Sequence, residues 1–140
     1  MSFKKTICHL TALFALTITS QSEWANWRGP NMDGSSSAKN VPVSFSQEKN
    51  VRWSIPMPGS AASTPIISNG KVFVTSTDPK TEELLALAYD LKSGKKLWGQ
   101  VVGSGLNQDD RSNYAGASPV SDGKHVLFFY GTGDMAVYNH

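Results

Sequence analysis

The sequence has very little of the two residue types that most often build metal and nucleophile sites. It contains one cysteine, Cys8, and three histidines among its 140 residues. Cys8 lies in an N-terminal segment that we expect to be removed, so the mature chain has no cysteine for a disulfide, a thiolate metal site or a nucleophile. His9, His125 and His140 have no metal-ligand spacing. We therefore predict no metal site.

A long apolar run is also lacking. The apolar stretch near the N-terminus, residues 10–18, is nine residues long, whereas a helix that spans a bilayer needs about 20. Lys4 and Lys5 precede it, and Ser20-Gln21-Ser22 follows it with the small-x-small form of a cleavage site. We therefore expect residues 1–22 to be a signal peptide that is cleaved after Ser22. The product would be periplasmic or secreted, without a membrane span.

The mature chain has no excess of charge of either sign. The 13 Lys and Arg residues become 11 when two lysines leave with the signal peptide, which equals the 11 Asp and Glu residues. A chain without a basic cluster has no electrostatic footprint for a phosphate backbone. We therefore expect no nucleic acid as a partner, and we look instead to a protein or a component of the cell envelope.

The mature sequence divides into an arm and a β-rich part. Residues 23–50 are rich in Gly, Pro, Asn and Ser, which is typical of an extended arm with turns. From residue 51 onward, short β-branched and aromatic runs alternate with turn residues. Residues 82–91 have the composition of a helix, but the repeat to which they belong favours a strand. In the first repeat unit we predict strands at residues 64–67, 71–77, 84–90 and 96–102.

Turn residues separate these strands. Asn69-Gly70 suits a type I′ hairpin between the first two strands, because both positions accept positive φ. Ser93-Gly94 supplies the corresponding turn before the fourth strand. Gly131 to Asp134 is expected to be a β-turn rather than a phosphate loop, because it lies between two strands and not before a helix. Residues 80–83 are expected to form a charged hairpin tip.

The β-rich part repeats itself. Trp53 and Trp98 are 45 residues apart, and each lies in a β-type run that is followed by a glycine. Residues 64–71 match residues 118–124 if one residue is deleted. Ala88-Tyr89-Asp90 matches Val137-Tyr138-Asn139, 49 positions later. A polar insertion at residues 107–114 accounts for the unequal offsets.

A unit of about 45 residues with four short strands has the size of a β-propeller blade. We therefore predict an all-β fold, a partial β-propeller of about two four-stranded blades. Its expected parts are a closing strand at residues 51–56, blade one at residues 64–102 and a partial blade two at residues 117–140. The given sequence ends at His140, before the turn, Gly and Trp expected for blade two. We therefore expect an N-terminal fragment whose remaining blades lie in missing C-terminal sequence.

One motif carries a family resemblance. Residues 88–98, AYDLKSGKKLW, resemble the tryptophan-docking motif of pyrroloquinoline-quinone-type propellers, A-x-D-x-x-[TS]-G-x-x-x-W, over all eleven positions. Asp90 can bond turn amides, Gly94 can take a left-handed conformation, and Trp98 can fill the gap between adjacent blades. Ala88 leaves room where a neighbouring indole would lie. We expect these four residues to have a structural role.

The arm carries a second resemblance. Residues 24–34, WANWRGPNMDG, are similar to the W-x-x-[WF]-R-G-P-x-x-x-G opening of exported bacterial propellers of the same superfamily. We expect Trp27, Arg28 and Gly29 to pack the arm against the propeller rim rather than to bind a ligand.

The resemblance implies two alternative functions. The first is a non-catalytic scaffold or binding propeller without a cofactor, similar to the propellers that help to assemble outer-membrane proteins. The alternative is the N-terminal part of a quinoprotein dehydrogenase that oxidises alcohols or sugars with pyrroloquinoline quinone and Ca²⁺. We favour the first and assign no catalytic residue. Asp109-Asp110, the only carboxylate pair in a polar loop, lacks the spacing of a calcium site.

Overall fold

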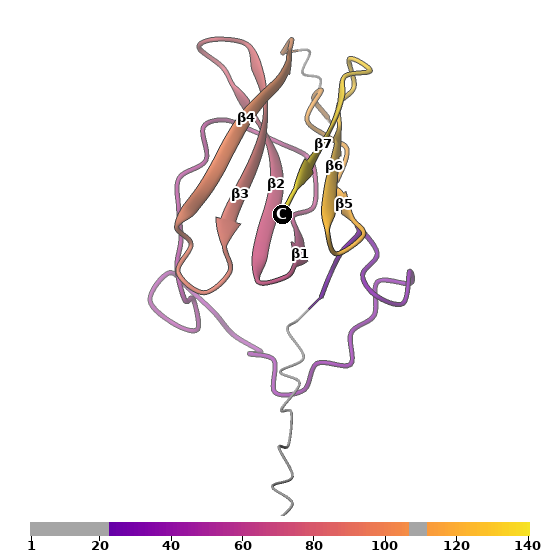
Figure 1. Cartoon of the computed structure of the whole chain (residues 1–140). Helices are drawn as coiled ribbons and strands as arrows, with labels where there is room; N and C mark the ends of the chain where they lie inside the picture. Colours follow the sequence, from indigo (N-terminus) through magenta and orange to yellow (C-terminus); the bar gives the residue numbers. More distant parts are fainter. Residues whose placement is uncertain (1–22, 107–111) are drawn as a thin grey trace, which may run out of the picture.

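The computed structural model describes residues 23–106 and 112–140, and this part of the chain is all-β. Seven strands form two antiparallel sheets (Figure 1). The first sheet contains, in order, β1 (Ile66–Ser68), β2 (Lys71–Asp78), β3 (Glu83–Asp90) and β4 (Lys96–Ser104). The second contains β5 (Val120–Ser121), β6 (His125–Phe129) and β7 (Met135–Asn139). The described residues include no helix that could cross a membrane.

The four strands predicted for the first repeat unit are all present. Within residues 82–91, which resemble a helix in composition, residues 83–90 form β3, because their apolar side chains pack on both faces of the sheet. Leu84, Ala86 and Ala88 are fully buried on the face toward the second sheet, while Leu87 and Tyr89 pair with β2 residues on the other face. The type I′ hairpin is confirmed, because Asn69 and Gly70 have φ values of 48° and 71°.

The register of the hairpins corrects one part of the sequence alignment. Ile66 pairs with Phe73 in the first sheet, and Val120 pairs with Leu127 in the second, so both partners lie 54 positions later. The deletion expected from the sequence is therefore wrong, and the two hairpins have equal length. The glycine has instead moved to the first central position of the second turn, where Gly123 has a φ of 90°. A type II′ turn takes glycine at that position, whereas a type I′ turn accepts it at either.

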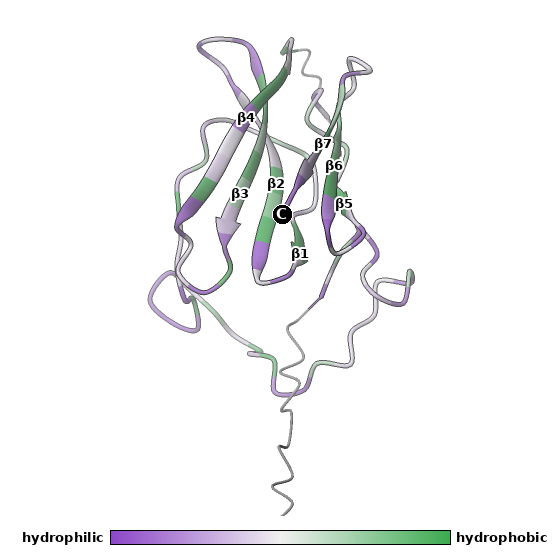
Figure 2. Ribbon diagram, viewed as in Figure 1, coloured by the Kyte–Doolittle hydropathy of each residue, from purple (hydrophilic) through white to green (hydrophobic). Residues whose placement is uncertain are grey.

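The core lies between the two sheets. Phe73, Ala86 and Ala88 of the first sheet and Val126 and Phe128 of the second are fully buried in one cluster. Figure 2 shows hydrophobic residues along β2, β3 and β6 and hydrophilic residues at the hairpin turns. Burial of apolar area is the main driving force for this packing, at about 25 cal/mol per Å². The apolar side chains that share one face of a sheet therefore determine which face packs against the other sheet.

The two sheets pack head-to-tail, so that equivalent residues of the two repeats point in the same direction, toward the interface from one sheet and away from it on the other. Tyr138 faces the first sheet, where its ring centroid lies 5.4 Å from that of Trp98. Its counterpart, Tyr89, lies on the outer face of the first sheet, beside Val72 and Val74. Ala88 faces inward and is fully buried, whereas its counterpart, Val137, is 57% exposed. The second sheet leaves its other face outward, whereas the arm covers that of the first sheet, where Leu87 and Tyr89 are buried.

The N-terminal arm packs through a different tryptophan from the one expected. Trp24 forms an isolated bridge with Ile67, and its ring covers Gly29, where an added Cβ would lie 2.6 Å from the indole. Gly29 is buried, in line with the expectation. Trp27, however, is 65% exposed, and Arg28 lies over its ring at 5.9 Å. Within the described residues, Trp24 rather than Trp27 packs the arm against the first sheet, and packing of Trp27 and Arg28 on a propeller rim stays a prediction.

Candidate functional site

The turn between β3 and β4 is organised by Asp90. Its Oδ1 accepts hydrogen bonds from the backbone N–H groups of Lys92 (3.2 Å) and Ser93 (2.8 Å) and from the Ser93 hydroxyl (2.6 Å). The Gly94 N–H donates to the Asp90 carbonyl over 2.8 Å, which closes the turn. The sequence-based role of Asp90 as a partner of turn amides is confirmed.

These hydrogen bonds affect the acidity of Asp90. The bonds from Ser93, first from its hydroxyl and then from its backbone N–H, hold the pKa of the Asp90 carboxyl below its usual value. A carboxyl whose pKa is lowered in the folded state contributes stability above its unfolded pKa of about 4, and this contribution is lost as the pH falls. We predict that Asp90→Asn unfolds at lower urea concentration than the wild type at pH 7. We also predict that its stability falls less between pH 5 and pH 2. A parallel loss of stability in both proteins would contradict this role of Asp90.

The Trp53 indole packs directly against Gly94. Gly94 has a φ of 70° and is buried, and a Cβ at this position would lie 2.6 Å from the Trp53 indole. The Trp53 Nε1–H donates to the carbonyl of Leu91 over 3.0 Å. An indole therefore lies on the turn of the motif and is fixed by one backbone hydrogen bond. The sequence pointed to Trp53 only as a distant repeat of Trp98, and its contact with Gly94 was missed.

Trp98, the last residue of the motif, lies between the two sheets. It is the cross-strand partner of Ala88, whose small side chain leaves room for the indole. Its ring centroid lies 5.9 Å from that of Phe73 in the first sheet and 6.1 Å from that of Phe128 in the second. The expectation that Trp98 fills a gap between two sheets is confirmed. Ala88 and Trp98 thus support the packing of the two sheets, Asp90 the turn, and Gly94 the contact of the turn with Trp53.

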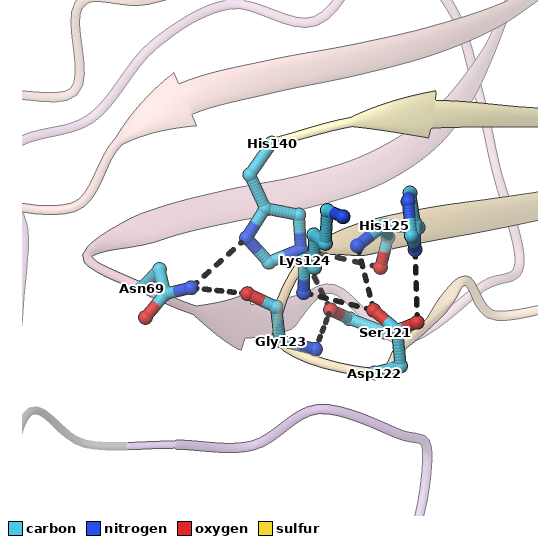
Figure 3. Close-up of polar contacts among 7 residues, drawn as sticks. All are labelled: Asn69, Ser121, Asp122, Gly123, Lys124, His125 and His140. Atoms are coloured by element: carbon cyan, nitrogen blue, oxygen red, sulfur yellow. Dashed lines mark hydrogen bonds and ion pairs between the residues drawn. The ribbon is translucent and has the colours of Figure 1, made fainter.

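A second polar cluster surrounds the turn between β5 and β6 (Figure 3). Asp122 accepts hydrogen bonds from the side chain of His125 (2.9 Å) and from the backbone N–H groups of Lys124 and His125. The hydrogen bond from the His125 side chain is the main cause of an Asp122 pKa far below the usual value. Asp122 is well exposed. Its contacts are local, so it stabilises the turn.

Ser121 and His140 lie close together in the same cluster, but they are not arranged for nucleophilic catalysis. His140 Nε2 lies 2.7 Å from Ser121 Oγ and 3.2 Å from the His125 carbonyl. Its Nδ1 faces the amide nitrogen of Asn69, which is a hydrogen-bond donor because it also donates to the Gly123 carbonyl. This arrangement fits Nδ1 as the acceptor and a proton on Nε2, because the His125 carbonyl beside Nε2 can only accept. A general base for Ser121 would need a free lone pair on Nε2.

The other candidate residues from the sequence form turns or lie outside the described residues. The Gly131 to Asp134 segment is a turn, with the Tyr130 N–H donating to the Asp134 carbonyl over 3.0 Å. At the tip between β2 and β3, the Thr81 hydroxyl donates to Glu83 over 2.8 Å. Asp109-Asp110 lies outside the described residues. Within the described ranges, no group of three or more His, Cys, Asp or Glu residues is placed to hold a metal ion.

A cleft beside Trp27 is the most polar of the open cavities described. It has a volume of about 480 Å³, and its lining consists of Trp27, Ala62, Thr64, Gly116, Ala117 and Ser118. The loops before β1 and before β5 form two of its sides, and the Thr64 N–H donates to the Ser118 hydroxyl over 2.9 Å. The cleft thus combines an exposed indole with small and hydroxyl-bearing side chains.

The described residues thus form two antiparallel sheets whose first hairpins share one register, with Trp98 packed between the sheets. No family model, no curated protein and no solved structure matches this chain.

Proposed function

We propose that this chain is part of an exported β-propeller of the pyrroloquinoline-quinone-repeat kind and that it acts as a non-catalytic scaffold or binding module. The observation that carries this proposal is the docking of Trp53 on Gly94 and the Leu91 carbonyl. Trp98, 45 positions later, packs between the two sheets. Propellers are built from such repeated sheets, each of which buries its faces against its neighbours. Residues 51–56, which form no strand among the described residues, would close the ring.

A binding role is supported by the exposure of Trp27. An indole that is 65% exposed contributes little to folding, but it offers a large flat surface to a ligand. It borders the cleft of about 480 Å³ described above. The partner that we propose is a protein or another component of the cell envelope. The arrangement of Ser121 and His140, with the proton on Nε2, favours a structural over a catalytic use of the only Ser–His pair in contact in the described residues.

The enzymatic alternative has a direct test. A quinoprotein dehydrogenase would need oxygen ligands for Ca²⁺ and a carboxylate base beside the quinone. We predict that the purified chain, supplied with pyrroloquinoline quinone and Ca²⁺, does not reduce a redox dye with a panel of alcohols and aldoses. A known quinoprotein serves as the positive control. Turnover that depends on the quinone would overthrow the proposal of a non-catalytic role.

Export has a test of its own. The proposed signal peptide, residues 1–22, lies outside the described residues. We predict that the chain expressed with its own N-terminus is recovered from the periplasm or medium and that its first residue is Glu23, because the small-x-small sequence ends at Ser22. N-terminal sequencing and intact-mass measurement check this. Replacement of Lys4 and Lys5 by Glu should block processing, and a product that still begins at Met1 would contradict export.

A further inference from the structure

The cleft beside Trp27 is built from equivalent positions of the two repeats. The hairpin register relates residues that are 54 positions apart, so Ala62 and Thr64 correspond to Gly116 and Ser118. All four residues line the cleft, which has a volume of about 480 Å³. Each repeat thus supplies one small residue and one hydroxyl group to the same opening. A cleft of this size is typical of a site for a small organic ligand.

The two hydroxyl groups of the cleft have unused hydrogen-bonding capacity. Ser118 Oγ accepts a hydrogen bond from the Thr64 backbone N–H over 2.9 Å, but its own proton has no acceptor among the described residues. The Thr64 hydroxyl forms no hydrogen bond within the same part of the chain, and both side chains are only half-buried. Hydroxyl groups that can both donate and accept suit a ligand that carries several hydroxyl groups itself.

Trp27 and Arg28 add an aromatic surface and a positive charge to this site. Trp27 lines the cleft and is 65% exposed, and the Arg28 Cζ lies over its ring, 5.9 Å from the centroid. Arg28 is exposed as well, and its guanidinium forms no ion pair with a carboxylate of residues 23–106 or 112–140. The N–H groups of the guanidinium are therefore available to an anion, and their planar geometry matches a carboxylate.

This combination favours an acidic sugar over a protein partner. The C–H groups of a pyranose form an apolar side that packs on the negative face of an indole such as Trp27. A carboxylate on the same sugar would pair with Arg28. Alanine and serine, by contrast, are depleted at protein interfaces, yet Ala62, Ala117 and Ser118 belong to the cleft lining.

We propose that the cleft binds an acidic oligosaccharide of the uronic-acid class. One sugar ring would lie on Trp27, with its hydroxyl groups bonded to Thr64 and Ser118 and its carboxylate bonded to Arg28. This inference rests on the proposed binding role and specifies the cell-envelope partner as a glycan. The cleft lies at the loops before β1 and β5. The outer face of the second sheet therefore stays available to the further blades of the proposed propeller.

The test is isothermal titration calorimetry of the mature chain with three hexasaccharides, oligogalacturonate, oligoglucuronate and neutral maltohexaose. We expect at least one acidic hexamer to bind, about tenfold more tightly than maltohexaose. Trp27→Ala should weaken this binding about tenfold, and Arg28→Gln should remove the preference for the acidic hexamer. Phe45→Ala is the matched control, because Phe45 is an aromatic residue of the same arm, is 76% exposed and does not line the cleft.

A second variant tests the cleft without changing Trp27 or Arg28. Ala62→Phe fills the opening from an exposed position and should abolish binding of the acidic hexamer, and urea unfolding checks that each variant is folded. If neither acidic hexamer binds, the proposal is wrong and a protein partner is favoured. Binding that both Trp27→Ala and Ala62→Phe leave unchanged would also overturn it and leave Trp27 to the packing of the arm. Neither result bears on the non-catalytic role, whose failure would appear separately as quinone-dependent turnover.

Discussion

Replacement of Trp98 by Ala is expected to lower the free energy of unfolding by about 3 kcal/mol. The indole contacts aromatic rings of both sheets, with centroid distances of 5.9 Å to Phe73, 6.1 Å to Phe128 and 5.4 Å to Tyr138. Its removal would leave a cavity that neither sheet can fill, because the facing partner on β3 is Ala88. Urea unfolding, followed by intrinsic fluorescence and circular dichroism, measures the change.

The adjacent residue supplies a matched control for this prediction. Leu97 is 44% exposed, so Leu97→Ala removes an apolar side chain from the same strand without opening the core. We expect it to change the stability by less than about 1 kcal/mol. Equal losses for the two variants would mean that Trp98 contributes only to the strand, and the packing between the sheets would then have to rest on other residues.

Much of the first sheet could be predicted from sequence because its determinants are local. Asn69-Gly70 specifies its turn through two positive φ values, and the side chain of Asp90 bonds the backbone that follows it within three residues. The β3 strand was also predicted correctly, although its composition favours a helix. The internal repeat predicted a strand in that segment, and it was the better guide because intrinsic helix propensity is only a weak preference.

The features that the sequence could not settle depend on contacts between distant segments. The equal length of the two hairpins was missed because glycines at different turn positions look alike in an alignment, whereas strand pairing distinguishes Gly70 from Gly123. Trp24 and Trp27 are three positions apart and equally apolar, and only the surface around Ile67 decides which one packs. The direction in which each sheet faces likewise follows from pairing and burial, which no single motif encodes.

Gly94→Ala is expected to destabilise the chain by about 3 kcal/mol, by two separate effects. An alanine at a φ of 70° is strained, which costs about 1 kcal/mol. Its Cβ would also lie 2.6 Å from the Trp53 indole, and an overlap of this kind in a packed region costs about 2 kcal/mol more. Displacement of the indole would break the hydrogen bond from Trp53 Nε1 to the Leu91 carbonyl as well.

A second glycine and a double-mutant cycle separate these two effects. Gly123 has a φ of 90° but no atom within 4 Å of its added Cβ, so Gly123→Ala should cost only the strain of about 1 kcal/mol. Once Trp53 is already Ala, Gly94→Ala meets no indole. The double variant should therefore lose about 2 kcal/mol less than the sum of the two single variants, because residues in contact are not additive. Strict additivity in urea unfolding would show that Trp53 does not lie on Gly94 in solution, and the tryptophan-docked repeat would lose its main support.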